Sequence, residues 1–320
     1  MAQYSNKVID KVIDIAALGE AMVEFNQATP GEPNYRQGFG GDTSNAVIAA
    51  SRQGARTAYL SRVGDDSFGG MLLALWREEG VDTSAVQRDP DAPTGLYFVN
   101  HGPDGHAFSY LRAGSAASRM HAQTMDLEIV ASARWLHVSA ISQAISAGAC
   151  DTVFAAIERA RASGTLVSYD PNLRLALWPL ARARAIICAT IGMTDLFMPS
   201  LDEALALAGT DDVEKVFAWC QSQGARSVVL KCGPKGAWYA EAGAAPQLVA
   251  GYPVDAVDAT GAGDCFDGSL LARLAAGDTL GEAVRYANVS AALSTLGHGA
   301  VAPIPIAGRV RAAMNTSVQA

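Results

Sequence analysis

The sequence has few cysteines, and none of them stand at a spacing that metal sites or redox motifs use. Five cysteines are scattered over 320 residues without any CxxC pair. An odd number without such spacing argues against a disulfide framework and against a structural zinc site. The five histidines also lack a metal-binding spacing such as HExxH. We therefore interpret the cysteines as buried free thiols in a reducing compartment.

Basic residues are outnumbered by acidic ones, and long apolar runs are missing. The chain has 24 lysines and arginines against 32 aspartates and glutamates, a formal net charge of -8. An acidic surface repels nucleic-acid backbones and anionic lipid, so we expect neither nucleic acid nor a membrane as a partner. No apolar run is long enough to cross a bilayer, and the N-terminal segment lacks the layout of a signal peptide. These features predict a cytoplasmic protein.

The order of the expected elements indicates an α/β fold. Half of the residues are hydrophobic, which is enough for a large core. Short β-rich runs alternate with longer helical patterns, as in VIDIAALG followed by SNAVIAASRQG, and TAYLSRVG followed by SFGGMLLALWREEG. Such alternation implies right-handed crossovers and a doubly wound, mostly parallel sheet with helices on both faces.

Two segments interrupt this alternation. Residues 84–112 have no helical pattern and contain two β-like runs, TGLYFVNH and HAFSYLR, joined by the turn sequence GPDG. Residues 21–39 are also β-like and irregular. We expect both segments to form one small antiparallel sheet, inserted into a single α/β domain that spans residues 1–320.

A glycine-rich turn next to an acid, DATGAGD at residues 258–264, precedes a helical pattern. A helix that begins there presents unpaired backbone N–H groups, and glycine lets an anion approach them closely. Gly261, Ala262 and Gly263 could cradle a phosphate, while Asp264 could accept a proton from a neighbouring hydroxyl. This pairing suits phosphoryl transfer. The plain alternative is a tight turn followed by an acid that suits a helix N-terminus, and the chain has neither a Walker A loop nor a GxGxxG motif.

Context favours the first interpretation. DATGAGD followed by FDGSLLA resembles a signature of the ribokinase-type (PfkB) carbohydrate kinases, and GFGGDTSNAVIAASRQG at residues 38–54 resembles a second one. The two motifs stand in the family's order, and the similarity covers nearly the whole chain. The resemblance implies a ribokinase-like fold in which segments of about 21–39 and 84–112 form a substrate lid. It also implies ATP and Mg²⁺ as cofactors and a homodimer formed through the lid.

Four further stretches, GFGGDTSN, TGLY, SYLRAGSAAS and DPNLRLALW, resemble the ketodeoxygluconate branch of this family. The substrate-binding residues that this resemblance implies are Gly41, Asp42, Asn45, Tyr97, Tyr110, Arg112 and Arg174. The chemistry agrees, because a guanidinium binds a carboxylate bidentately, while Tyr, Asp and Asn suit a sugar ring and its hydroxyls. Taken one at a time, Arg112 and Arg174 are better explained as surface charges, and Tyr97 and Tyr110 as packing aromatics. Taken together, in motifs that match one branch, they favour the site.

The resemblance also implies a nucleotide site in the second half of the chain. Its residues would be Ser200, Lys231, Gly233, Lys235, Gly236 and Asn288. Glu203 matches an acid that organises Mg²⁺ through water, although Ser200 stands where the family often has Asn. Asp258 and Thr260 match a region that binds a monovalent cation, often K⁺. From the residues alone, Ser200 and Glu203 also fit a helix cap, and KCGPKG also fits a hairpin turn.

Together these inferences predict an ATP-dependent kinase that converts 2-keto-3-deoxygluconate to 2-keto-3-deoxy-6-phosphogluconate. Asp264 would act as the base and the amides of residues 261–264 as the anion hole. Two alternatives stay open: a kinase of a neutral sugar such as fructose or ribose, and a sugar- or nucleotide-binding sensor without turnover. Arg112 and Arg174 favour an acid over a neutral sugar. The choice between gluconate- and galactonate-derived acids stays open as well.

Overall fold

The main body of the protein is a mostly parallel sheet enclosed by helices. The computed structural model describes residues 11–102, 105–210 and 212–316. Across these residues the strand order is β14-β13-β12-β11-β10-β9-β1-β4-β5, and β6 also pairs with β4. In the same order, the strands span Gln247–Ala250, Gly236–Glu241, Ser227–Lys231, Leu196–Phe197, Leu166–Asp170, Ala133–Ser139, Ile13–Leu18, Thr57–Gly64, Val81–Asp82 and Val86–Asp89. All pairs are parallel except those of β13 with its two neighbours, which confirms the predicted α/β fold.

Strand β1 shows why the sheet is central. Its sequence IDIAAL is apolar after the single acid, and its residues from Ile15 to Leu18 are almost fully buried. Ala16 and Leu18 pack into one core layer, whereas Ile15 and Ala17 pack into the layers on the opposite face. A strand that is apolar at successive positions is typical of a sheet covered on both sides.

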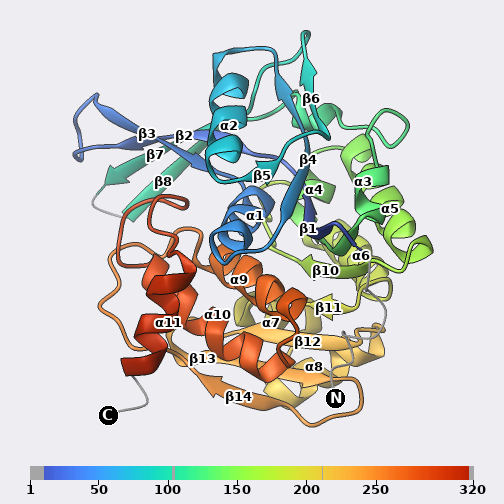
Figure 1. Cartoon of the computed structure of the whole chain (residues 1–320). Helices are drawn as coiled ribbons and strands as arrows, with labels where there is room; N and C mark the ends of the chain where they lie inside the picture. The colour runs from blue at the N-terminus through green and yellow to red at the C-terminus, as the bar shows by residue number, and fades with distance from the viewer. Residues whose placement is uncertain (1–10, 103–104, 211, 317–320) are drawn as a thin grey trace.

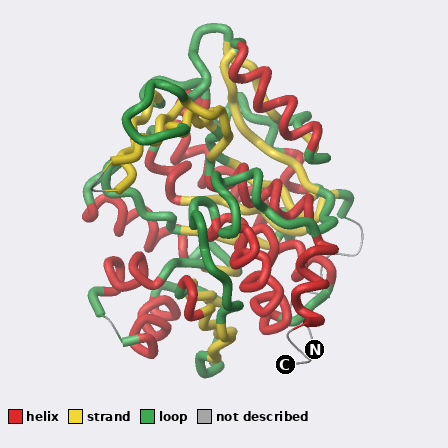
Figure 2. The backbone as a smooth tube through the Cα atoms, turned by 90° about the vertical axis from the view of Figure 1, so that its left-hand side faces the viewer, coloured by secondary structure: helices red, strands yellow, loops and turns green. Residues whose placement is uncertain are grey.

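Helices cover the two faces of the sheet (Figure 1 and Figure 2). The first face carries α1, α2, α9 and α10, which span Asp42–Arg52, Ser67–Glu78, Ala262–Ala276 and Leu280–Ser294. The second carries α3 to α8, which span Glu128–Ala131, Ala140–Ala144, Ala147–Ala162, Leu180–Ile191, Leu201–Ala208 and Val213–Ser222. Helix α11, Ala307–Thr316, packs against α10. Within the described ranges, none of these helices combines the length and the apolarity that crossing a bilayer requires.

A separate four-stranded sheet, which we call the lid, stands off the main body (Figure 1). Its strand order is β3-β2-β7-β8, and these strands span Tyr35–Gly40, Met22–Gln27, Leu96–Gly102 and Gly105–Leu111. The lid confirms the small second sheet that the sequence predicted. The predicted GPDG turn includes residues 103–104, which lie outside the described residues, and the strands on either side of it pair with each other.

The expectation that this small sheet is entirely antiparallel is wrong. The pairs β2–β3 and β7–β8 are antiparallel hairpins, but β2 and β7 pair in parallel. Each hairpin begins with a strand that leaves the main body, so the two leading strands run in the same direction where they meet. The second of the two segments enters the lid at Leu96, because the strand before it, β6, pairs with β4 in the main sheet.

Candidate active site

Two helices on the same face of the sheet begin after glycines, which have no side chain to cap them. Gly41 precedes α1 with φ of 125°, and a Cβ there would lie 2.4 Å from the carbonyl oxygen of Glu20. Gly261 precedes α9 in the left-handed region with φ of 74°. By contrast, α2 and α5 begin with side-chain caps from Asp66 and Ser146. At the start of α1 the Asp42 carboxylate accepts a bond from the backbone of Thr43, whereas the start of α9 keeps the N–H groups of Gly263 and Asp264 available for an anionic group.

Asp264 lies in the first turn of α9 and faces α1. Its carboxylate accepts a hydrogen bond of 2.8 Å from the side-chain amide of Asn45. Burial, and next the negative charge of Asp42, raise the pKa of Asp264 to about 8, and the bond from Asn45 opposes this shift. The Oδ1 atom of Asn45 is buried and has no hydrogen-bond partner among the described residues. The site thus combines a basic carboxylate with an open acceptor, which suits a ligand that offers hydroxyl groups.

The start of α1 is tied to the end of β10. Asp42 accepts bonds from the backbone of Thr43 at 2.8 Å and from the amide of Asn172 at 3.4 Å. Asn172 has φ of 31°, an unusual backbone conformation for a residue with a side chain, and Asp170 caps its backbone at 3.1 Å. Burial raises the pKa of Asp42. This short loop after β10 therefore brings two carboxylates close to Asp264.

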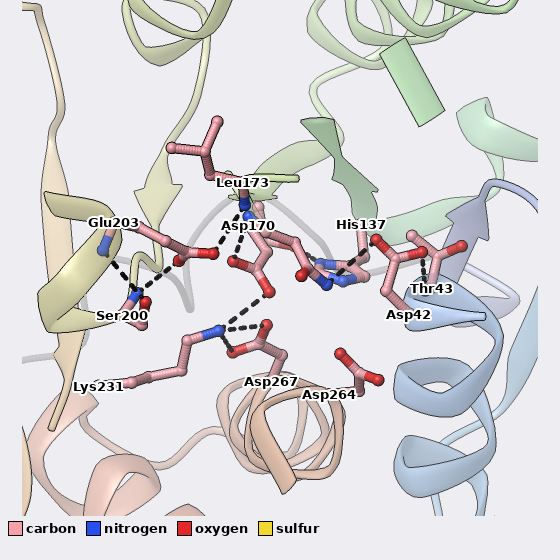
Figure 3. A network of polar contacts seen from close by, with 12 residues as sticks. Asp42, Thr43, His137, Asp170, Leu173, Ser200, Glu203, Lys231, Asp264 and Asp267 are labelled. Carbon is pink, nitrogen blue, oxygen red and sulfur yellow. Dashed lines mark hydrogen bonds and ion pairs between the residues drawn. The ribbon is translucent and has the colours of Figure 1, made fainter. Parts of the chain in front are cut away.

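A cluster of buried charges lies behind Asp264 (Figure 3). The ammonium of Lys231, at the end of β12, lies 3.0 Å from Asp170 and 3.0 Å from Asp267. His137 belongs to the same region, and burial lowers its pKa to about 4, so its ring is neutral near pH 7. Lys231 was predicted from the sequence, whereas Asp170 and Asp267 were not. The available signals were the acid that opens DPN and the acid one helical turn after Asp264.

The predicted lid residues lie near one another. The rings of Tyr97 and Tyr110 stack with centroids 5.8 Å apart, and the guanidinium of Arg112 lies 5.9 Å from the Tyr110 ring. Tyr97 donates its hydroxyl hydrogen to Glu24, and Arg112 forms an ion pair with Glu20. The Nε of Arg112 is buried without a partner among the described residues, so it remains a donor for a ligand.

Glu20 and Glu24 were not anticipated from the sequence, yet both are buried acids that hold predicted ligand residues. Glu20 also accepts a bond of 2.6 Å from Ser115. Arg174 differs from Arg112, because it is exposed and donates at 3.2 Å to the carbonyl of its neighbour Leu173. The structure therefore brings one of the two predicted arginines into the cluster and leaves the other at the surface.

Several of the residues predicted for the nucleotide and its Mg²⁺ hold helices in place. Ser200 and Glu203 form the capping box of α7, in which Glu203 accepts bonds of 2.8 Å from the Ser200 backbone and 2.7 Å from that of Leu173. Asn288 is buried and donates to the carbonyls of Val249 at 3.1 Å and Ala250 at 3.2 Å, so it ties α10 to β14.

A short 3₁₀ turn, η2 at Gly233–Lys235, follows β12. Gly233 is the first residue of this turn, Gly236 follows its last residue, and Lys235 is exposed. Lys231, by contrast, turns its ammonium inward to the carboxylates. The loop thus offers one lysine to solvent, while the other lies close to α9.

The loop before α9 is held together by Asp258. This carboxylate accepts bonds from the backbone of Thr260 at 2.9 Å, from its hydroxyl at 2.6 Å and from the backbone of Gly299 at 2.9 Å. Burial alone would raise the pKa of Asp258, but these hydrogen bonds outweigh it and the pKa is lowered. In the described part of the chain, no group of three or more His, Cys, Asp or Glu side chains is placed to hold a metal ion.

The chemistry open to this site follows from its geometry. A hydroxyl placed at Asp264 would meet a carboxylate able to accept its proton, directly beside the uncapped N-terminus of α9. If the hydroxyl oxygen attacks an anionic group bound there, the backbone donors would stabilise the negative charge that develops on that group. The site is therefore suited to group transfer onto a hydroxyl.

Comparisons with known proteins agree with this chemistry. The model of the pfkB family carbohydrate kinases matches residues 12–307. A 2-dehydro-3-deoxygluconokinase of Thermoproteus tenax is 35% identical over 82% of this chain and 82% of its own. Fructokinase-1 of Zea mays is 34% identical over 92% of this chain and 96% of its own. A crystal structure of a putative ribokinase II from E. coli, in complex with ATP and Mg²⁺, has a TM-score of 0.88 at 27% identity and covers 95% of this chain and 100% of that one.

Proposed function

Since the chain belongs to the pfkB family of carbohydrate kinases, we propose that this sugar kinase uses ATP to phosphorylate 2-keto-3-deoxygluconate on its primary hydroxyl. The observation that carries the kinase chemistry is the hydrogen-bonded pair of Asn45 and Asp264 at the uncapped start of α9. The similarity to a 2-dehydro-3-deoxygluconokinase supports the choice of substrate.

The reaction would begin with the sugar hydroxyl hydrogen-bonded to Asp264. Asp264 accepts the proton as the hydroxyl oxygen forms a bond to the γ-phosphorus, while the bond from that phosphorus to the leaving oxygen of ADP breaks. A pKa of about 8 makes Asp264 a better proton acceptor than an ordinary aspartate. The N–H of Ala262 already donates at 3.1 Å to the carbonyl of Ala259, so the N–H groups of Gly263 and Asp264 would stabilise the charge on the phosphoryl oxygens during transfer.

The nucleotide would enter with Mg²⁺, which would supply charge neutralisation for its phosphates. Both carboxylate oxygens of Glu203 already accept backbone hydrogen bonds, so this side chain fits a role through water better than direct ligation. Asp258 is also fully engaged, by Thr260 and Gly299. This donor set fits an Mg²⁺ ion carried mainly by phosphates and water. Thr260 and Asp258 stay candidates for organising a nearby K⁺ site.

A sugar acid is supported by Arg112. Its guanidinium is mostly buried, it is aligned with Tyr110, and its Nε donor is free of a partner among the described residues. A carboxylate binds such a donor more strongly than a neutral hydroxyl does. The free Oδ1 of Asn45 would accept a bond from a sugar hydroxyl next to the base. Arg174 would add a second cation only after turning inward from the surface.

A neutral sugar is the second candidate, and one contact favours it. The charge of Arg112 is already balanced by Glu20, so the lid does not depend on a ligand carboxylate for neutrality. The similarity to a fructokinase over 92% of the chain points the same way.

An ADP-release assay over sugar acids and neutral sugars separates the two candidates. We expect 2-keto-3-deoxygluconate to give the highest kcat/KM, with product phosphorylated at the 6-hydroxyl as read by phosphorus NMR. A higher kcat/KM for fructose or ribose would replace the first candidate by the second. If the protein binds ligands but forms no ADP from ATP with any of the sugars, a sensor would be favoured.

The lid edge supports a further expectation, a homodimer formed through the lid. Strand β8 is an edge strand, and its side chains Phe108 and Leu111 are 48% and 63% exposed. Apolar groups on an open edge favour pairing with a second surface. Light scattering after size exclusion would report the mass, and a monomer at working concentration would contradict the dimer. A cytoplasmic location stays a prediction.

A further inference from the structure

The ammonium of Lys231 is held between two buried carboxylates that come from different elements. Its Nζ lies 3.0 Å from Oδ2 of Asp170 at the end of β10, and 3.2 and 3.0 Å from the two oxygens of Asp267 in α9. The three side chains are 12%, 5% and 0% exposed. Figure 3 shows this ammonium pointing to the two acids, beside Asp264.

The cluster lies directly under the first turn of α9. A Cβ built on Gly263 would lie 3.8 Å from Nζ of Lys231, so the ammonium is adjacent to the backbone of the anion hole. Asp267 follows Asp264 by three residues, which places both carboxylates on the same side of the helix. The positive charge is therefore near both the base and the helix start.

We propose that Lys231 is a positioning residue, locked under the anion hole by Asp267 and Asp170 as a fixed counter-charge for Asp264, and that it does not leave this place to bind nucleotide phosphates. The role rests on the proposed kinase function. Withdrawing the ammonium would leave two carboxylates without a cation in a buried setting, which is strongly unfavourable. The exposed Lys235 is free to serve the nucleotide instead.

The charges around Asp264 agree with this role. Burial is the largest cause of the raised pKa of Asp264, and the charges of Asp42 in α1 and Asp170 in β10 raise it further. The hydrogen bond from Asn45 and the charge of Lys231 in β12 lower it. The lid adds Tyr97, whose pKa is raised mainly by burial and by Glu24, with a smaller effect of Asp264.

Asp267 completes this set of charges from within α9. Burial raises its pKa well above its usual range, and Asp170 raises it further while Lys231 opposes the shift. Without the ammonium, the base would remain protonated to a higher pH.

The first test is the pH profile of kcat/KM for wild type and Lys231→Met. Since Lys231 lowers the pKa of Asp264, we expect the ascending limb to move up by about one pH unit. At pH 7 the rate should fall about tenfold in consequence, while KM for ATP stays within about twofold. A limb that does not move, together with a KM for ATP that rises about tenfold or more, would identify Lys231 as a nucleotide ligand and overturn the proposal.

A second measurement does not need turnover. Carbon-13 NMR follows the carboxyl of Asp264 directly, with Asp264→Asn assigning its signal. Because Lys231→Met leaves buried acids unpaired, the double variant Lys231→Met/Asp267→Leu is the safer form, and it should also raise the Asp264 midpoint. Asp267→Asn is the matched comparison, because the new amide can donate to Asp170 and accept from Lys231. In this variant the titration midpoint of Asp264 should stay near that of wild type.

The outcomes separate the two claims. If wild type phosphorylates no sugar, the proposed function fails, and the NMR titration still judges the role of Lys231. An Asp264 midpoint that is the same in wild type and in every folded Lys231 variant would overturn the positioning role even in an active kinase.

Discussion

The side-chain amide of Asn45 donates a 2.8 Å hydrogen bond to the carboxylate of Asp264, although 219 positions separate the two residues in the chain. Asn45 lies in the first turn of α1 and Asp264 in the first turn of α9, and the two helices pack against each other. The orientation of the Asp264 carboxylate is therefore set by helix packing, so changes to this carboxylate, to the packing or to the lid should have distinct consequences.

Replacing the base should abolish turnover and spare binding. We expect Asp264→Asn to lower kcat about 10²- to 10⁴-fold, because the amide cannot accept the hydroxyl proton. Asn can still accept the bond from Asn45, so the fold and sugar affinity should persist. ADP release and calorimetric titration with the sugar measure the two effects. A variant with more than a tenth of wild-type kcat would remove Asp264 from the role of base.

The same variant should stabilise the protein at alkaline pH. The folded pKa of Asp264, about 8, exceeds the usual value of 3.8, so folding favours its protonated form. This stabilisation is fully present below about pH 4 and is lost as the pH rises through about 8. Asp264→Asn should therefore gain about 5 kcal/mol over wild type at pH 8, several degrees in Tm, and much less at pH 4. A Tm difference that does not change between these pH values would contradict the raised pKa.

The packing of α1 on α9 can be tested at Gly268. A Cβ at this position would lie 2.0 Å from the carbonyl oxygen of Ala46, so Gly268→Ala must push the helices apart. We expect a loss of about 1–3 kcal/mol in the free energy of unfolding and a lower kcat, because Asn45 would move relative to Asp264.

Gly70 provides the matched control for that substitution. It lies inside α2, and a Cβ there would meet nothing within 4 Å. Gly70→Ala should therefore be neutral or stabilising by up to about 1 kcal/mol. Chemical denaturation and steady-state kinetics on both variants would show equal effects only if the contact at Gly268 were unimportant.

The substrate class can be tested at Arg112. Arg112→Gln removes the charge and keeps a donor for Glu20, which limits damage to the fold. For a sugar acid we expect kcat/KM to fall roughly 30- to 150-fold, which corresponds to a loss of about 2–3 kcal/mol in transition-state stabilisation. For a neutral sugar we expect a much smaller fall. Arg119→Gln is a control at a more exposed arginine, which pairs with Asp89. Equal losses for acid and neutral sugars would remove the carboxylate argument.

Much of the fold could be predicted because its signals are local. Strand and helix patterns alternate along the chain, and the α9 helix begins at Ala262, directly after the glycine that the motif predicted. The parallel pairing of β2 with β7 was not predictable in this way, since it depends on how two distant hairpins meet.

The site was predictable where a motif carries it and not where burial decides. Asp267 lies in a helix interior and Asp170 ends a strand, so each resembles a surface acid until its neighbours are known. Lys231 was expected at the nucleotide because it precedes a glycine-rich loop, yet its ammonium turns inward to these two acids. The exposure of Arg174 likewise depends on a loop conformation that local sequence does not specify.

Because β2 and β7 pair in parallel, the lid is built from two hairpins that are far apart along the sequence. Anyone who wishes to exchange substrate preference between relatives by transplanting this sheet would have to move both hairpins together. A chimaera that carries one foreign hairpin would join it to a native partner across mismatched side chains. Moving only β7 and β8, for example, would separate Tyr97 from Glu24, the residue on β2 that accepts its hydroxyl hydrogen bond.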